Sequence, residues 1–170
     1  MPYTSTPRTW VAGEVPTATH FNDNLRDFAR GFTDAWTSYT PTLTASTTNP
    51  TNWTQTGYYC RVGKLVIAKF KITASATRTV GSGTYYIALP VNANTNIDYA
   101  ELGTCNIFLT TGSVGHKGHL QLDGTNQRAR IEYVSAYPTG TVANVTHNTP
   151  FAWDTNSDTA IRGTLLYEAA

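Results

Sequence analysis

Charged residues are scarce in this chain of 170 residues, and their two signs nearly cancel. Lys and Arg number 12 and Asp and Glu 11, so charged residues make up 14% of the chain and the net charge is +1. A nucleic-acid-binding protein draws its affinity from clustered Lys and Arg, and the balance found here argues against that class. Two explanations fit a surface with so few charges: part of it is buried against partner proteins, or threonine hydroxyls supply its polarity.

Long apolar runs and export signals are also missing. No run approaches the roughly 18 to 20 apolar residues that cross a bilayer, and residues 1–16 lack the basic-then-apolar order of a signal peptide. We therefore expect no membrane partner. Only four Glu and four Lys are present, against 31 Thr and 10 Tyr. Thr and Tyr favour pleated strands, whereas Glu and Lys supply most helix surfaces, so the composition predicts an all-β protein.

Cysteine is nearly absent, and the two cysteines lie far apart in sequence. Cys60 stands in GYYCRVG and Cys105 in LGTCNIF, both in apolar, strand-like surroundings. A single cysteine on a strand is most often a small core residue, and a disulfide between the two is the alternative. Neither has a Cys or His neighbour at metal-ligand spacing.

The first 16 residues have the composition of an extended arm. Prolines at positions 2, 7 and 16 interrupt it, because proline removes backbone donors and biases its predecessor toward extended geometry. Its apolar anchors are Trp10, Val11 and Val15. Trp10 either packs back on its own subunit or docks into a neighbouring protein.

A short amphipathic helix is predicted over residues 17–31, capped by Thr17 or Thr19. Its large apolar residues follow a spacing of four, three and four that places them in one narrow stripe; they are Phe21, Leu25, Phe28 and Phe32. Such a stripe is typical of a coiled-coil seam as well as of a packed helix. We predict that it forms a subunit interface, and that residues 1–35 are an attachment arm and helix preceding a β domain over 36–170.

The remainder of the chain alternates short strand-like runs with turns. Strands are predicted over 39–44, 58–62, 64–73, 84–89, 99–110, 119–122, 128–135 and 160–168, with a bend or bulge at Gly103 and a tight turn at Asp123-Gly124. Polar stretches over 45–57, 74–83 and 92–97 are predicted loops. Strands without crossover helices indicate an antiparallel β-sandwich of about eight strands, of which a jelly roll is one version.

No arrangement of residues typical of an enzyme is present. His116 and His119 are three apart, which on a strand places them on opposite faces, so a metal site would need further ligands. The acidic pairs Asp98/Glu101 and Asp154/Asp158 lie in polar stretches and are interpreted as solvated acids. We therefore expect no catalytic, cofactor-binding or metal-binding residues.

Aromatic residues in polar surroundings offer a different possibility, a surface on which sugar rings could stack. The candidates are Trp53, Tyr58, Tyr59, Tyr85, Tyr86, Tyr137 and Trp153. In an adjacent Tyr-Tyr pair on a strand one ring must face inward, so fewer rings are exposed than the sequence contains. Core packing and subunit contacts are the alternative roles.

Two stretches resemble small virion proteins of tailed bacteriophages. Residues 6–28 carry the pattern T-W-x-x-G-E-x-x-T-A-x-x-x-N and look like the N-terminal attachment segment of phage tail, fibre and capsid-decorating proteins. Residues 35–46, 57–73 and 83–91 look like the β-rich module of those proteins, with Y-x-R-V-G-K before an alternating strand and a later strand ending in L-P-V. Pro16 departs from the attachment pattern, where a β-branched residue is more usual.

This resemblance implies a non-enzymatic virion protein, made in the host cytoplasm and located on the particle surface. It implies attachment through Trp10, Val11, Gly13, Glu14 and Val15 to the major capsid protein or another virion protein, and assembly of the sandwich as a homotrimer. Our first expectation is a capsid decoration protein. The alternative is a short tail or head fibre protein that binds host-surface glycans. A polysaccharide-active enzyme is the third possibility, and it lacks the acidic residues it would need.

Overall fold

Antiparallel strands make up almost all of the described chain. The computed structural model describes residues 9, 11–22, 36–97, 100–109, 114–136, 140–150, 153 and 159–170. Its elements are α1 (Ala18–Phe21), β1 (Thr37–Tyr39), β2 (Leu43–Ala45), β3 (Thr51–Val62), β4 (Leu65–Thr79), β5 (Tyr85–Ala88), β6 (Glu101–Leu109), β7 (Val114–Asp123), β8 (Arg128–Ala136), β9 (Thr141–Asn144) and β10 (Thr159–Glu168). The strands pair in the order β1-β3-β4-β10-β6-β7-β8-β5-β2, with β9 on β8. The predicted all-β, antiparallel, sandwich-like fold is confirmed, and the described residues form ten strands instead of about eight.

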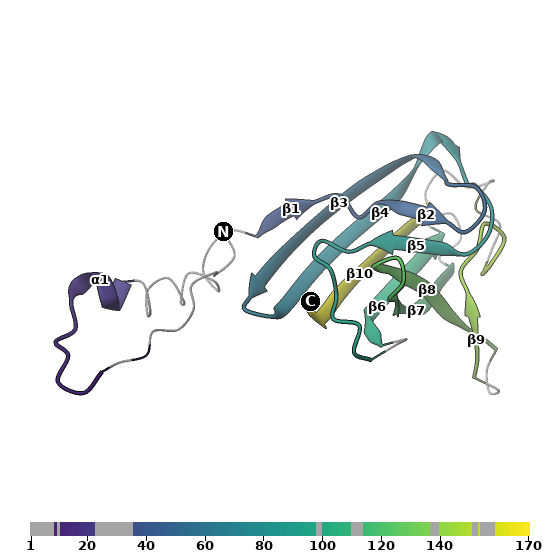
Figure 1. The fold of residues 1–170 in the computed structure, drawn as a ribbon. Helices are drawn as coiled ribbons and strands as arrows, with labels where there is room; N and C mark the ends of the chain where they lie inside the picture. Colours follow the sequence, from purple (N-terminus) through teal and green to yellow (C-terminus); the bar gives the residue numbers. More distant parts are fainter. Residues whose placement is uncertain are drawn as a thin grey trace.

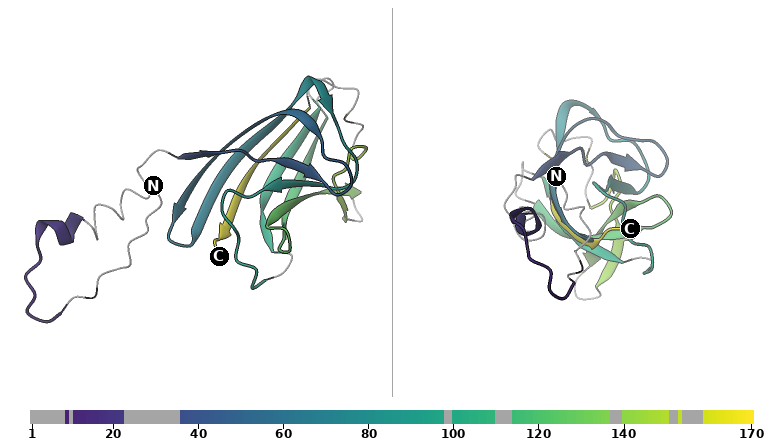
Figure 2. Two further views of the ribbon diagram at one scale, coloured as in Figure 1. Left: turned by 45° about the horizontal axis from the view of Figure 1, so that its top comes forward. Right: turned by 60° about the vertical axis from the view of Figure 1, so that its left-hand side comes forward.

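The sheet curls into a half-barrel around its inner face (Figures 1 and 2). β1 and β2 lie at opposite ends of the strand order, yet only three residues separate them in the chain. Because the four peptide steps from Tyr39 to Leu43 span at most about 14 Å, the curl must bring the two edges of the sheet close together. The prediction of one strand over 39–44 is wrong here. Pro41 has no N–H to donate to a ladder, and Thr42 instead donates to the Thr40 carbonyl at 2.8 Å in a tight turn.

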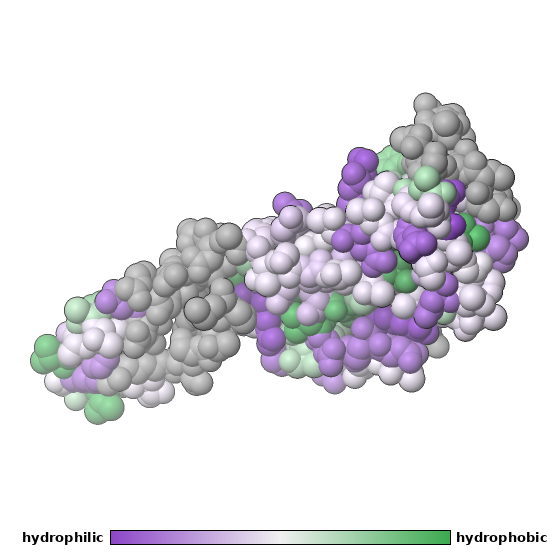
Figure 3. Space-filling view, turned by 90° about the horizontal axis from the view of Figure 1, so that it is seen from above, coloured by the Kyte–Doolittle hydropathy of each residue, from purple (hydrophilic) through white to green (hydrophobic). Residues whose placement is uncertain are grey.

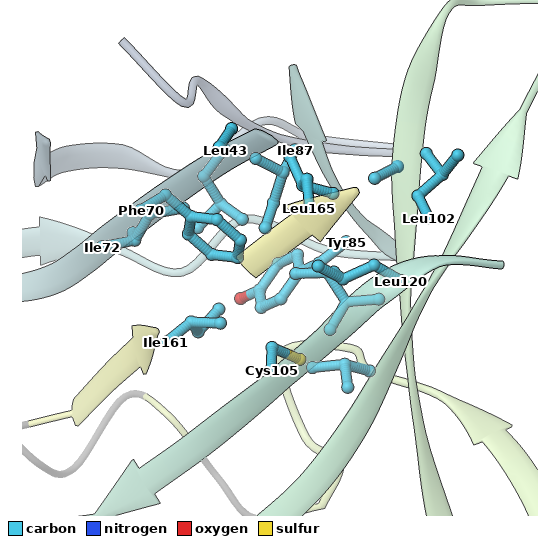
Figure 4. Packing of buried hydrophobic residues seen from close by; sticks show 14 of the residues in the cluster. Leu43, Phe70, Ile72, Tyr85, Ile87, Leu102, Cys105, Leu120, Ile161 and Leu165 are labelled. Atoms are coloured by element: carbon cyan, nitrogen blue, oxygen red, sulfur yellow. The ribbon is translucent and has the colours of Figure 1, made fainter. Parts of the chain in front are cut away.

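Alternation of buried and exposed residues along the strands places the core on the inner face. In β4 the inward residues Val66, Ala68, Phe70 and Ile72 are all buried, while Leu65 and Ile67 face solvent. In β10 Ile161, Leu165 and Tyr167 are buried, and Arg162 and Thr164 are exposed. Figure 4 shows how inward side chains from several strands meet around Tyr85.

Two of the predicted loops are largely strand. β3 begins at Thr51, inside the predicted loop 45–57, and β4 continues to Thr79, inside the predicted loop 74–83. The two extensions pair with each other from Trp53 opposite Ala74 to Thr51 opposite Thr79, with a register shift between Thr51 and Trp53. A threonine on the outward face of a strand favours strand geometry and can also contact solvent through its hydroxyl. A polar sequence is therefore not enough to predict a loop. The short strand β9 was not predicted, whereas the predicted loop 92–97 contains no strand.

The predicted hairpin between β7 and β8 is present, with a longer turn than Asp-Gly alone. Residues 124–127 form the turn, and Asn126 donates its N–H to the Asp123 carbonyl at 3.2 Å. The residue with positive φ is Gln127, at +52°, and not Gly124. Asp123 accepts from Arg128 at 2.7 Å and from Asn126 at 3.0 Å, which fixes both ends of the turn.

Only the beginning of the predicted helix falls within the described residues. α1 covers four residues, and Thr17 caps it as predicted by accepting the His20 N–H at 3.3 Å while His20 Nδ1 accepts the Thr17 N–H. Residues 23–35, which would contain the rest of the predicted helix, lie outside the described part of the chain. Within the described residues, no helix has the length and apolar character required to span a bilayer.

Candidate functional site

The N-terminal segment presents apolar side chains to solvent. Val11 accepts the Glu14 N–H at 3.0 Å and closes a turn in which Gly13 has a φ of +84°, a conformation that glycine adopts readily. On either side of this turn Val11 is 71% and Val15 80% exposed. Trp10, which was also predicted to be an attachment residue, lies outside the described residues. The turn therefore holds two valines outward with no apolar surface of the described chain over them.

α1 adds a third exposed apolar residue, because Phe21 is 50% exposed. Its partners in the predicted interface stripe, Leu25, Phe28 and Phe32, lie outside the described residues, so the stripe stays a prediction. In Figures 1 and 2 the segment with α1 lies apart from the sheet, and hydrophobic atoms show on its surface in Figure 3.

The residues considered for metal and acid-base chemistry do not come together within the described ranges. His119 faces outward, and its Nδ1 lies 3.1 Å from Glu101 Oε1. His116 is on the opposite face of the strand, the same face as the buried Leu120, and its ring packs edge-on against the Tyr133 ring. No group of three potential metal ligands occurs among the described residues. Asp98, Asp154 and Asp158 lie outside the described part of the chain.

Three of the seven aromatic residues considered for sugar stacking are core residues. Trp53, Tyr85 and Trp153 are buried, and the Trp153 ring centroid lies 5.9 Å from that of Trp53 and 5.6 Å from that of Tyr85. For these three residues the structure shows core packing, the alternative role considered for them. Trp53 on β3, Tyr85 on β5 and Trp153 in the connection from β9 to β10 pack into one cluster, although they lie far apart in the sequence.

The remaining stacking candidates are only partly accessible. Tyr58 is exposed, Tyr59 is half-buried, and Tyr86 is covered by the Arg128 guanidinium, whose carbon lies 3.5 Å from the ring centroid. Tyr137 lies outside the described residues. A ring whose face already carries a guanidinium is not open to a sugar. Tyr58 is the most accessible stacking candidate among the described residues, at 42% exposed, and Lys69 Nζ lies 6.0 Å from its ring centroid.

A pocket of about 370 Å³ opens where the 92–97 loop meets the ends of β6 and β10. Ala93 pairs with Ala169, and Asn94 donates its N–H to the Glu168 carbonyl at 2.8 Å, so the loop is tied to the C-terminal strand. The lining combines apolar side chains with the amides of Asn94 and Asn96 and the carboxylates of Glu101 and Glu168. This pocket was not predicted from the sequence, because it depends on contacts between segments more than 70 residues apart.

Each carboxylate at the pocket is engaged by a basic residue. Lys64 lies 3.2 Å from Glu168, and hydrogen bonds from Lys64 and Asn94 lower the pKa of the Glu168 carboxyl. Glu101 is engaged by His119. A carboxyl whose pKa is lowered is ionised at neutral pH and cannot act as a general acid there. The pocket is suited to binding a small polar group through hydrogen bonds.

The two cysteines behave as separate residues, and the alternative of a mutual disulfide is wrong because neither forms a disulfide. Cys105 is buried, as predicted for a small core residue, and burial raises the pKa of its thiol to about 12. Cys60 is half-buried. Since the thiolate is the reactive form, burial and protonation both protect Cys105.

We therefore expect a thiol reagent at pH 8 to modify one cysteine of the native protein, and both after denaturation. Reaction with a chromogenic disulfide, followed by absorbance, gives the count. Cys60→Ser should abolish the native reaction and Cys105→Ser should leave it unchanged. Equal rates for both thiols in the native protein would contradict the burial of Cys105.

Comparisons of the chain with protein-family models, with curated proteins and with solved structures gave no match. The functional interpretation accordingly depends on the residues and their arrangement.

Proposed function

We propose that this chain is a non-enzymatic structural protein of a bacteriophage virion, attached to the particle by its N-terminal segment. The observation that carries the proposal is the exposure of Val11, Val15 and Phe21 in a segment lying apart from the sheet. Residues of this kind gain stability only when a partner surface covers them. The sequence pattern of residues 9–22, which resembles phage attachment segments, supports a virion protein as that partner.

In its finer form the proposal is a homotrimer that decorates the capsid and adds buried area between capsid subunits. A specific interface typically buries about 1,600 Å², which an arm and a helix from each subunit could supply. The alternative of a short tail or head fibre that binds host glycans is weakened by the burial of Trp53, Tyr85 and Trp153.

Replacing Val11 and Val15 together with Asp tests the attachment. Burial of a valine side chain contributes about 1.5 kcal/mol or more, so the double variant should bind particles lacking this protein roughly a hundredfold more weakly. Cosedimentation of the full-length variant with such particles measures the loss. Because both residues are exposed in the described structure, the melting temperature should not change.

Val134 and Val142 provide a matched control on the sheet. They pair directly between β8 and β9 and are 41% and 53% exposed, so Val134→Asp with Val142→Asp introduces the same charges elsewhere. This control should bind particles normally and sediment, like the unmodified protein, as a trimer. Full particle binding by the Val11/Val15 variant would place attachment elsewhere in the chain and overturn the proposal.

A further inference from the structure

Four cations lie close together on the outer face of the sheet, and none of them has an acidic partner among the described residues. Lys69 and Lys71 stand on β4, Arg162 on β10 and Lys117 on β7, and all four are exposed. Strand pairing places Lys71 opposite Arg162, Arg162 opposite Asn106, and Asn106 opposite Lys117. Lys71, Arg162, Asn106 and Lys117 thus form one row across four strands, about 14 Å long at the usual strand spacing. We call these residues, together with Lys69, the basic row.

The acidic residues of the described chain are engaged elsewhere. Each of the five has a basic partner outside the basic row: Glu14 with His20, Glu101 with His119, Asp123 with Arg128, Glu132 with Arg130, and Glu168 with Lys64. No described carboxylate forms an ion pair with a member of the row. Three of the four lysines of the chain are therefore gathered where the described structure supplies no counter-charge.

This arrangement costs stability in the isolated protein, because like charges directly opposite each other on neighbouring strands repel. Two of the cations are also held in place by aromatic rings. Lys69 Nζ lies 4.8 Å from the Trp36 ring centroid, and the Arg162 guanidinium carbon lies 5.6 Å from that of Phe108. Such contacts orient the cations toward the outer face without neutralising them.

We infer that the basic row binds a linear acidic polysaccharide lying across the strands. Arg162 suits a carboxylate, which it can engage with two parallel hydrogen bonds, and the lysines supply point charges on either side. Between and beside the cations lie Asn106 and the exposed hydroxyls of Thr56 and Thr164. Amides and hydroxyls match the hydroxyl groups that separate the charges of an acidic polysaccharide. This inference does not depend on the virion assignment.

The same observations disfavour the other polyanions. Duplex DNA carries about one charge per 1.7 Å of its axis, a far denser charge than four cations and a net charge of +1 can match. Single strands stack their bases on open aromatic faces, whereas the Trp36 and Phe108 rings already carry cations. An acidic protein would need an apolar anchor at the centre of its interface, and the row places Asn106 there.

The test measures binding of the full chain to polygalacturonate, a linear polymer with one carboxylate per ring, by calorimetry at low salt. We expect binding that weakens as salt is added, and no binding to the uncharged polysaccharide pullulan. Lys71→Gln with Arg162→Gln should reduce the affinity about fivefold, the effect of losing two exposed charge contacts. Its melting temperature should not fall, because the substitution removes a repulsion.

Arg61→Gln with Lys64→Gln is the matched control, because it removes two positive charges at the β3–β4 turn, outside the row. This control should retain full affinity. The inference is overturned if the unmodified protein does not bind polygalacturonate, or if both double variants lose affinity equally. Tighter binding of oligodeoxythymidylate or of poly-L-glutamate would also overturn it and would identify a nucleic acid or an acidic protein as the partner.

Discussion

Replacing Trp153 with alanine is expected to lower the free energy of unfolding by about 3–5 kcal/mol, the range for removing a large aromatic side chain from a core. Trp153 is fully buried and its ring touches both the Trp53 and the Tyr85 rings, so a cavity would open between β3, β5 and the connection from β9 to β10. For a chain of this size the loss corresponds to a fall in melting temperature of about 10 °C. Thermal unfolding followed by circular dichroism measures it.

The backbone of Trp153 adds to this effect. Its N–H donates to the His147 carbonyl at 3.2 Å, and its carbonyl accepts from Arg78 Nη2 at 2.5 Å. Trp153 therefore attaches the connection between β9 and β10 to the end of β4. Once the ring is gone, these polar contacts have no apolar packing to hold them in place.

Tyr85→Phe is the control that separates the stability contributed by ring packing from that contributed by hydrogen bonding. The Tyr85 hydroxyl donates to the Val80 carbonyl at 2.5 Å, and the phenylalanine keeps the ring while losing that bond, at a cost of about 1 kcal/mol. If Trp153→Ala were no more destabilising than Tyr85→Phe, the aromatic cluster would not be a main part of the core.

The strands that the sequence predicts best are those with one buried and one exposed face. In β4 and β10 apolar residues recur at every second position, and a shift of one residue would turn every side chain to the wrong face. That pattern is local and can be recognised without the structure. The extension of β3 over Thr51–Gly57 carries little such pattern, because its outward residues and its connections are both rich in Thr and Asn.

The candidate sites depend more strongly on long-range pairing. The four cations of the basic row look like ordinary outward residues of three separate strands. They become one surface because β10 inserts between β4 and β6, a topology that local sequence patterns do not determine. The burial of Trp53 and Trp153 has the same origin, since the two residues are separated by 100 positions yet their rings lie 5.9 Å apart.

Gly103 illustrates how a single backbone position sets the orientation of neighbouring side chains. In β6 the inward residues Cys105 and Ile107 have odd numbers, yet Leu102 is also buried. The register of β6 against β7 shifts between Glu101 and Gly103, as the sequence predicted for a bulge at this glycine. The extra residue changes the alternation and turns Leu102 into the core.

Gly103→Ala is therefore expected to destabilise the protein by about 3 kcal/mol or more. The φ of Gly103 is +152°, which side chains rarely tolerate, and a Cβ there would fall on the Thr164 carbonyl oxygen and within 3.1 Å of the Leu165 Cα. Both contacts are with the backbone of β10, which cannot move without breaking its ladders to β4 and β6.

Gly63→Ala separates the two causes, because Gly63 has a φ of +58° but no atom within 4 Å of its Cβ position. Its cost should be the conformational one alone, about 1 kcal/mol. Chemical denaturation of both variants under identical conditions gives the comparison. Equal losses at the two positions would mean that β10 yields to the added methyl group and that the bulge does not fix the register.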